Sequence, residues 1–284
     1  MGKKRTSKES CGPSSGGILA EEIKQLAAEI AEINHKKTIE VLKDLERKTE
    51  EKIAYPTSKQ VDELVKAIAA LKNNKHLFSE KEEHVLLQQH MVFTLMVPGG
   101  RAERAHIALQ GLTDKGFFDN PSDWTADKVA KEINATVRWP NQKAARIVFA
   151  MSFWPTIVEN IKQHLPKNDM AGLYEIRKFL IKNVSGMSNK ASAHFMRNVG
   201  LFYGDTRAFP IIDTHIYKFL EAYNFKYSKT NYKDAERSFA AAASLTQLPL
   251  IFLDAILWCG LSGSWDVANL DFGNFKTLNK RKAA

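Results

Sequence analysis

The chain has few cysteines, and this scarcity excludes several classes of protein. Only Cys11 and Cys259 occur among 284 residues. A disulfide framework needs more, so the composition fits the reducing interior of a cell, and we expect an intracellular protein. Two cysteines also cannot supply the four thiolates of an iron–sulfur cluster. His84, His90 and Cys259 lie too far apart in sequence to indicate a metal site, so we predict none.

Long apolar runs and alternating patterns are also missing. Nothing approaches the run of about 18 apolar residues that a membrane span needs, so we expect no membrane partner. The charges of Met1–Arg5 precede no apolar segment, which excludes a secretory signal. Alternation of apolar and polar residues, typical of half-buried strands, is nearly absent. Apolar residues recur instead at helical spacing, and we predict a mostly α-helical protein.

Negative charge is too scarce to balance the positive charge. The chain has 41 Lys and Arg against 32 Asp and Glu, a net charge of +9. This excess favours a polyanionic partner such as nucleic acid, although it also serves solubility alone. Residues 1–17 combine basic residues with Ser, Gly and Pro, which predicts a disordered basic tail. Its Lys3-Lys4-Arg5 run is interpreted as a nuclear address, a DNA tether or merely solvated charge.

Residues 18–55 predict an N-terminal helical arm. Apolar residues follow helical spacing at Ile23, Leu26, Ile30, Ile33, Leu42 and Leu45. One interpretation is a coiled-coil arm that contacts another protein. Packing of this helix or helix pair on the body is favoured, because the heptad pattern breaks at Lys36-Lys37.

The most informative stretch is 184–200. Before it, apolar residues recur at helical spacing: Leu173, Ile176 and Leu180. A second helix begins near Ser188, and a tight turn at Gly186 joins the two, because Gly tolerates positive φ. Residues of about 173–199 therefore predict a helix-hairpin-helix. The turn and the start of the second helix direct free backbone N–H groups outward, where they can bind phosphate.

Two chemically suggestive residues follow this turn. Lys190 falls in the first turn of the second helix, where the helix dipole disfavours an ammonium and so favours the neutral, nucleophilic amine. Asp213, which directly precedes Thr214, is the natural carboxylate partner of Lys190. Each has an ordinary alternative: Lys190 is solvated, and Asp213 is the N-cap of the helix that begins at Thr214. The cap and a catalytic role of Asp213 are compatible.

These segments resemble the active-site region of the helix-hairpin-helix (HhH-GPD) DNA glycosylase superfamily, and most closely the microbial-type 8-oxoguanine DNA glycosylase/AP lyases. In that family Gly-x-Gly-x-Lys is followed by Ala-Ser-His-Phe-Leu-Arg-Asn-x-Gly and by Ile-Ile-Asp-x-His-Ile. The chain matches with Gly186–Lys190, Ser192–Gly200 and Ile211–Ile216. Weaker similarity lies in Val137–Ala144 and Leu253–Trp258. The resemblance covers about residues 80 to 263.

The resemblance implies a two-lobed helical fold with the reaction cleft between the lobes. Residues 100–200 form one lobe, which ends in the helix-hairpin-helix. Residues 56–99 and 201–284 form the flanking lobe, and the N-terminal arm of residues 18–55 is an addition.

The resemblance also implies roles for individual residues. Lys190 is the Schiff-base lysine and Asp213 the catalytic aspartate. The DNA backbone contacts are expected from the hairpin residues Gly186, Met187, Ser188 and Asn189. Trp139 and Trp258 are candidates for the wall of a pocket that receives a flipped base, with ordinary core aromatics as the alternative.

The implied function is base-excision repair of double-stranded DNA. The enzyme removes an oxidised purine, 8-oxoguanine above all, through a lysine Schiff base and β-elimination. The resemblance implies no cofactor, although a structural monovalent cation at the hairpin is compatible with it. We expect a monomer, located in the nucleus if the organism is eukaryotic. The alternatives are a monofunctional glycosylase, in which Asp213 activates water, and a noncatalytic DNA-binding protein. The presence of both Lys190 and Asp213 favours the enzyme.

The chain departs from the family pattern in three places. Ser188 replaces the second hairpin glycine. The segment between Lys190 and Asp213 is longer than in the microbial relatives, through residues 201–207. The chain also continues beyond Trp258 and has no match for the terminal lysine that helps those relatives to recognise 8-oxoguanine. The identity of the excised base is therefore the part of this prediction that the sequence matches support least.

Overall fold

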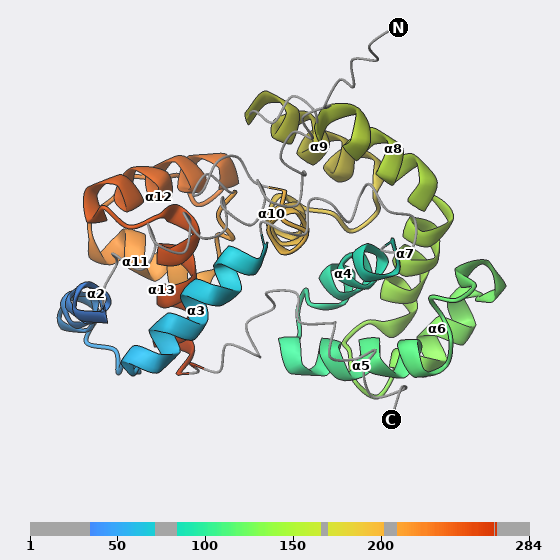
Figure 1. Cartoon of the computed structure of the whole chain (residues 1–284), viewed down its shortest axis with the longest axis horizontal. Coiled ribbons are helices and arrows are strands. Elements are labelled where there is room, and N and C mark those ends of the chain that lie inside the picture. The colour runs from blue at the N-terminus through green and yellow to red at the C-terminus, as the bar shows by residue number, and fades with distance from the viewer. Residues whose placement is uncertain (1–34, 72–83, 166–169, 202–208, 264, 266–284) are drawn as a thin grey trace, which may run out of the picture.

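The computed structural model describes residues 35–71, 84–165, 170–201, 209–263 and 265. The predicted tail of residues 1–17 and the first half of the predicted arm lie outside the described residues. Within them every regular element is helical, as the near-absence of alternating patterns predicts. Figure 1 shows two groups of helices, with α10 (Asn189–Asn198) seen end-on between them.

The first group follows the chain without interruption from α4 to α9. Its elements are α4 (His84–Met96), α5 (Ala102–Asp114), η3 (Pro121–Asp123), α6 (Ala126–Ile133), α7 (Pro140–Ser152), α8 (Trp154–His164) and α9 (Met170–Asn183). Together with α10 they enclose one core of buried side chains.

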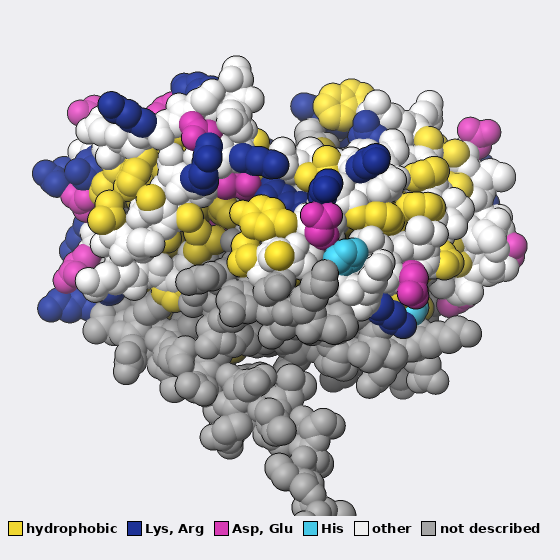
Figure 2. Space-filling model, turned by 90° about the horizontal axis from the view of Figure 1, so that it is seen from above, with side chains coloured by type: hydrophobic (Ala, Val, Ile, Leu, Met, Phe, Trp, Pro, Cys, Tyr) yellow, Lys and Arg dark blue, Asp and Glu magenta, His cyan; other side chains and the backbone are white. Residues whose placement is uncertain are grey.

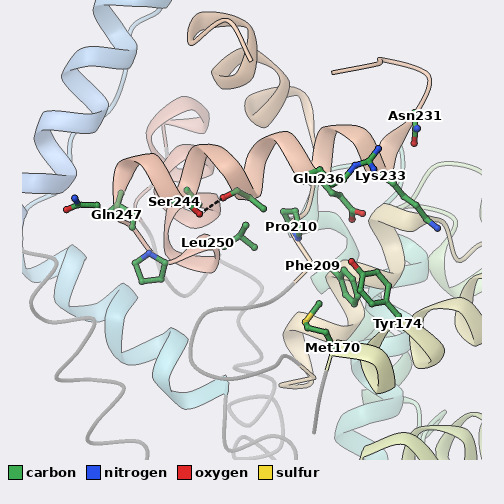
Figure 3. A pocket seen from close by; sticks show the side chains of 15 residues that line it. Met170, Tyr174, Phe209, Pro210, Asn231, Lys233, Glu236, Ser244, Gln247 and Leu250 are labelled. Atoms are coloured by element: carbon green, nitrogen blue, oxygen red, sulfur yellow. Dashed lines mark hydrogen bonds between the residues drawn. The ribbon is translucent and has the colours of Figure 1, made fainter. Parts of the chain in front are cut away.

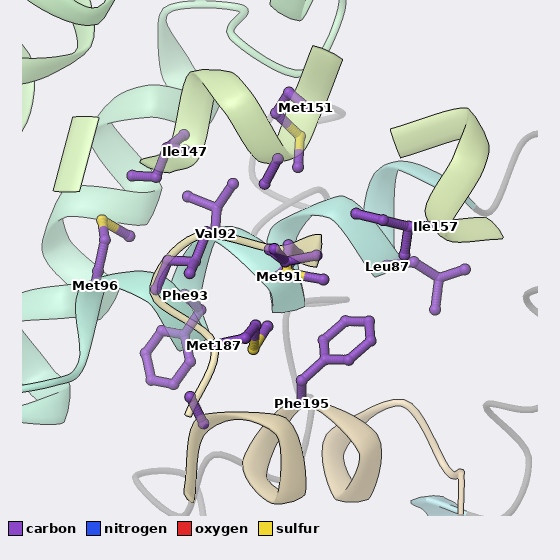
Figure 4. Packing of buried hydrophobic residues seen from close by; sticks show 14 of the residues in the cluster. Leu87, Met91, Val92, Phe93, Met96, Ile147, Met151, Ile157, Met187 and Phe195 are labelled. Carbon is purple, nitrogen blue, oxygen red and sulfur yellow. The ribbon is translucent and has the colours of Figure 1, made fainter. Parts of the chain in front are cut away.

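Helix α4 is the centre of this first core. Most of its residues are buried, and it packs against α5, α7 and α10. Figure 4 shows Met91 and Phe93 of α4 close to Met187 of the hairpin and Phe195 of α10. The sequence analysis grouped residues 84–96 with the flanking lobe, whereas their side chains pack within the first core. The reason is that this helix has no polar face and is covered on all sides.

The second group combines segments from the two ends of the described chain. Its elements are α2 (His35–Thr49), α3 (Ser58–Leu71), α11 (Thr214–Ala222), α12 (Tyr232–Thr246) and α13 (Leu250–Ser262). They share a separate core, in which α13 is buried along most of its length. This burial fits the strongly apolar sequence of α13.

Helix α2, the described part of the predicted arm, packs on the body. Leu42 and Leu45 are fully buried in the second core. A glycine in α13 allows the close approach, because a Cβ at Gly260 would lie 2.9 Å from Leu42 Cδ2. The Ala54 amide also donates a hydrogen bond to the Gly260 carbonyl at 3.0 Å. The described arm helix is therefore part of the fold.

No described helix is by itself long and apolar enough to cross a membrane. Helices α12 and α13 reach that length and composition only as a pair, and the chain bends by 96° between them.

Truncation of Leu42 tests whether α2 belongs to the core. Leu42→Ala should lower the free energy of unfolding by about 2–5 kcal/mol, because it deletes a buried side chain and leaves a cavity. The neighbouring exposed Lys43→Ala should change it by less than about 0.5 kcal/mol. Urea denaturation measures both values. Equal effects of the two substitutions would show that α2 does not contribute to the core.

Candidate active site

The hairpin between α9 and α10 is closed by one backbone bond and one glycine. The Met187 amide donates to the Val184 carbonyl at 3.0 Å. Gly186 has φ +91°, a conformation that side chains disfavour. A Cβ there would also lie 2.7 Å from Arg146 Cδ of α7. Glycine is therefore required at Gly186 both by the turn and by the close packing of α7.

Ser188, which replaces the second family glycine, begins α10. Its φ of −95° is an ordinary extended conformation, so no glycine is needed here. Its Oγ accepts a hydrogen bond from the Ala191 amide at 3.2 Å, which makes Ser188 the N-cap. The amides of Asn189 and Lys190 lie in the first turn, where a helix supplies no carbonyl partner. Such amides favour an anion, and the substitution to Ser preserves this property.

Lys190 and Asp213 occupy the starts of two helices. The Lys190 side chain is exposed in the first turn of α10. Asp213 is half-buried and caps α11, since its Oδ1 accepts from the His215 amide at 2.9 Å and from the Ile216 amide at 3.0 Å. The same oxygen takes both bonds, which leaves Oδ2 outside the cap. The capping bonds therefore do not occupy the whole carboxylate.

Asp254 of α13 is a buried carboxyl that contacts segments next to both Lys190 and Asp213. Its Oδ2 accepts from the Ile211 amide at 3.1 Å and lies 3.6 Å from Arg197 Nη1 of α10. Burial raises the pKa of Asp254 to about 6. Arg197 opposes this rise, and the charges of Asp213 and Lys190 also act on the carboxyl. Asp254 therefore contacts both the helix that carries Lys190 and the segment that leads to Asp213.

The segment that leads to Asp213 is held by both of the long C-terminal helices. The Ile211 amide is bound by Asp254 of α13, and the Ile212 amide donates to the Tyr232 hydroxyl of α12 at 2.9 Å. Burial, and then the nearby Glu236 carboxylate, raise the pKa of Tyr232, so this hydroxyl keeps its proton. Successive amides before Asp213 are thus anchored to different helices, which fixes the position of the cap.

Arg177 of α9 is a site residue that the sequence analysis missed. Its side chain is almost fully buried and pairs with Glu236 of α12 at 2.6 Å. Burial raises the pKa of Glu236, and Arg177 counteracts that rise. The sequence contained one signal: Arg177 follows Ile176 and lies four residues after Leu173, on the apolar side of the predicted helix.

The two candidate pocket tryptophans come from different groups of helices. Trp139 precedes α7 with φ +54° and is 58% exposed, with its ring packed over Gly99. Trp258 of α13 is partly buried against the second core. Trp139 is therefore not an ordinary core aromatic. That Trp139 and Trp258 line one base pocket stays a prediction.

Lys143 is a second amine with unusual surroundings. It is 1% exposed, and its Nζ donates to the Met96 carbonyl at the end of α4. Burial, and then the charge of Arg146, lower the pKa of Lys143. A buried amine bonded to the backbone cannot reach a substrate, so Lys143 joins α7 to α4 and does not compete with Lys190.

A cavity of about 890 Å³ opens beside the site. Figure 3 shows it along α12, with Tyr174, Phe209 and Glu236 at one end and Leu250 toward the other. Neither Lys190 nor Asp213 is among the described residues that line it. The cavity therefore does not contain the predicted catalytic pair.

The surface around the two groups of helices carries much positive charge. Figure 2 shows Lys and Arg side chains on both sides of a notch between the two halves of the molecule. Such a distribution suits a polyanion that spans both halves. Within the described ranges, no group of three or more His, Cys, Asp or Glu side chains could hold a metal ion.

Comparisons with known proteins give consistent matches. A family model described as 8-oxoguanine DNA glycosylase matches residues 66–248. The 8-oxoguanine DNA glycosylase/AP lyase of Korarchaeum cryptofilum is 27% identical over 213 residues, which cover 70% of this chain and 95% of that protein. Its counterpart in Methanocaldococcus jannaschii is 26% identical over 206 residues, 70% and 87% of the two chains. The solved 8-oxoguanine DNA glycosylase of Thermotoga maritima shares the fold, with a TM-score of 0.56 and 21% identity over 78% of this chain and 96% of that one.

The buried carboxyl of Asp254 predicts a pH dependence of stability. The folded chain holds this proton up to about pH 6, whereas the unfolded chain releases it near the ordinary value of 3.8. The native state thus binds more protons in this window, so rising pH destabilises it by up to about 1.4 kcal/mol per unit. Asp254→Asn lacks this contribution.

Urea denaturation of both proteins between pH 4 and pH 8 tests this expectation. The stability of Asp254→Asn relative to the wild type should rise from about pH 4 to pH 6 and then level off. Parallel stability curves across this range would show that Asp254 titrates normally.

Proposed function

The chain belongs to the 8-oxoguanine DNA glycosylase family, and from that premise we propose that it excises 8-oxoguanine from double-stranded DNA through a Schiff base on Lys190. Membership makes it a base-excision glycosylase and AP lyase. The substrate named for its relatives supports 8-oxoguanine as the excised base. One observation supports the choice of residues: the buried Asp254 carboxyl contacts Arg197 of α10, the helix of the exposed Lys190, and the Ile211 amide in the segment that leads to Asp213.

Base excision begins with electrostatic stabilisation. Breaking the N-glycosidic bond develops oxocarbenium character at C1′ of the sugar, and an anion at that point lowers the barrier. Asp213 supplies the anion, because its Oδ2 is not used by the capping bonds of α11. The Lys190 amine attacks C1′, and the base leaves with the electron pair of the broken bond. The departing base takes up the proton that the amine loses, so charge is conserved.

Strand cleavage follows from the covalent intermediate. The amine bonded to C1′ opens the sugar ring to a protonated imine, which withdraws electrons from C2′. A proton acceptor removes the proton at C2′. The electron pair of that C–H bond forms a C2′–C3′ double bond and expels the phosphate at C3′. Water then hydrolyses the imine and restores Lys190. These steps use only side-chain groups and water, so the proposed reaction needs no cofactor.

The hairpin is the proposed contact with the DNA backbone. Ser188 is exposed, and Gly186 and Asn189 are partly exposed, at the turn and the start of α10, where free amides and the helix dipole attract phosphate. Met187 contributes only its backbone, because its side chain is buried in the first core (Figure 4). A monovalent cation bound by the hairpin carbonyls is compatible with this proposal.

The proposed base pocket receives the lesion after it leaves the helix stack. Extrusion of a base requires a partner that replaces its stacking interactions. Trp139 is exposed and its ring packs over Gly99, so it offers a large flat surface for stacking. Trp258 offers a partly buried surface on the other group of helices.

Replacement of Lys190 tests the covalent chemistry. With duplex DNA that contains one 8-oxoguanine, borohydride should trap a covalent complex of the wild-type protein. Lys190→Gln should abolish this complex and strand cleavage, because no amine attacks C1′, while DNA affinity falls only a few-fold. Lys182→Gln, an exposed lysine at the end of α9, is the matched control and should trap normally.

Two other outcomes of this experiment would be informative. A full trapped complex in Lys190→Gln would show that another amine does the chemistry. Release of the base by the wild type without any trapped complex would identify a monofunctional glycosylase, in which Asp213 activates water.

Asp213→Asn separates the cap from the catalytic charge. Asn caps helices about as well as Asp, so the melting temperature should hardly change. Loss of the anion should slow base excision by about 10²-fold or more, as expected for the loss of one electrostatic stabiliser. Single-turnover excision and thermal melting measure the two effects. Excision at the wild-type rate with unchanged melting would mean that Asp213 is only a cap.

A further inference from the structure

The guanidinium of Arg177 bridges the two groups of helices. Arg177 belongs to α9 of the first group and Glu236 to α12 of the second. Nη1 and Nη2 of Arg177 donate to the two carboxylate oxygens of Glu236 at 3.0 and 2.6 Å. Two parallel bonds of this kind fix orientation as well as distance. The pair therefore sets how α12 lies against the helix-hairpin-helix.

The same guanidinium also contacts the start of α10. Its Nη2 donates to the Asn189 carbonyl at 3.0 Å, and its Nε donates to Ser192 Oγ at 3.3 Å. Ser192 Oγ in turn donates to the Asn189 carbonyl at 2.9 Å. Asn189 directly precedes Lys190, so these bonds hold the backbone that carries the amine.

A third contact joins Arg177 to the segment that leads to Asp213. The guanidinium carbon lies 4.3 Å from the centre of the Phe209 ring, a cation–π arrangement. Tyr174 packs edge-on against the same ring at 5.0 Å. From Phe209 the chain runs four residues to Asp213 through the amides that Asp254 and Tyr232 bind. One side chain thus touches the supports of both reactive groups.

Stability alone does not account for this arrangement. Burying two charges carries a desolvation penalty, and apolar residues of similar volume often hold helices together as well. An apolar side chain would not bind the Asn189 carbonyl, Ser192 and Glu236 together. Only the planar fork of arginine carries five donors in a fixed geometry. The buried pair therefore serves geometry more than stability.

We propose that Arg177 is a positioning residue, which with Glu236 fixes the Lys190 amine relative to the Asp213 carboxylate. This inference rests on the proposed function of that pair. Arg177 itself is buried and touches no substrate. Its contribution is to keep the amine within reach of C1′, since a misplacement of about 1 Å can cost about 10²-fold in rate.

The decisive variant removes both buried charges. Arg177→Met combined with Glu236→Gln leaves no unpaired buried ion, so folding is retained better than in either single variant. Its melting temperature and its affinity for DNA with an abasic-site analogue should stay close to the wild-type values. The single-turnover rate of excision at saturating DNA should fall by about 30-fold or more, because the supports of the two groups separate.

Two further variants complete the test. Lys178→Met with Glu175→Gln removes an exposed ion pair of α9, whose atoms lie 3.5 Å apart, and should leave the rate unchanged. Arg177→Lys keeps a charge for Glu236 but loses the fork that reaches Asn189 and Ser192. It should keep the melting temperature yet lose rate, which separates positioning from simple charge pairing. This variant decides the matter if the double variant does not fold.

The outcomes distinguish this inference from the proposed function. If the wild type forms no trapped complex through Lys190, the proposed function fails, whatever Arg177 does. If the wild type is active and the folded double variant, or Arg177→Lys, excises within about 3-fold of its rate, Arg177 does not position the pair. A rate loss explained wholly by weaker DNA binding would equally overturn the inference.

Discussion

The two proposed reactive groups, Lys190 and Asp213, belong to helices that pack in two separate cores, and the rest of the account depends on this constraint. Lys190 lies in the first turn of α10, whose buried side chains belong to the first core. Asp213 begins α11, whose buried side chains belong to the second. Neither core by itself fixes the distance or the relative orientation of Lys190 and Asp213. In the proposed mechanism, the contacts that cross between the cores set the distance and orientation of the pair.

Buried polar contacts provide this connection because apolar burial is non-directional. Packing of Leu, Ile and Phe brings helices together but leaves their register and rotation less defined. Around the site, Arg177 joins α9 and α10 to α12, and Asp254 joins α13 to α10 and to the Ile211 amide. Each of these groups is buried, and each has partners from more than one segment of the chain. The site is thus defined by hydrogen bonds placed between two apolar cores.

Local sequence predicted the parts of the site that depend on local chemistry. Gly186 marked a positive-φ turn, and Asp213 was identified as a cap, because both signals are contained in a few adjacent residues. The cap at Ser188 was not predicted, because the family pattern has glycine at this position and so offers no side-chain cap to compare. The Arg177–Glu236 pair could not be predicted, because its partners are 59 residues apart and belong to different cores. For the same reason, the placement of α4 within the first core followed only from the three-dimensional packing.

The most direct test of this account is to identify the residue that bears the DNA adduct. Wild-type protein is trapped with borohydride on duplex DNA containing 8-oxoguanine, the DNA is digested, and tryptic peptides are sequenced by mass spectrometry. The adduct should lie on Lys190, within an uncleaved peptide of residues 183–197, because the modified lysine resists trypsin. An adduct on any other lysine would contradict the account, since the contacts of Arg177, Asp213 and Asp254 would then surround the wrong amine.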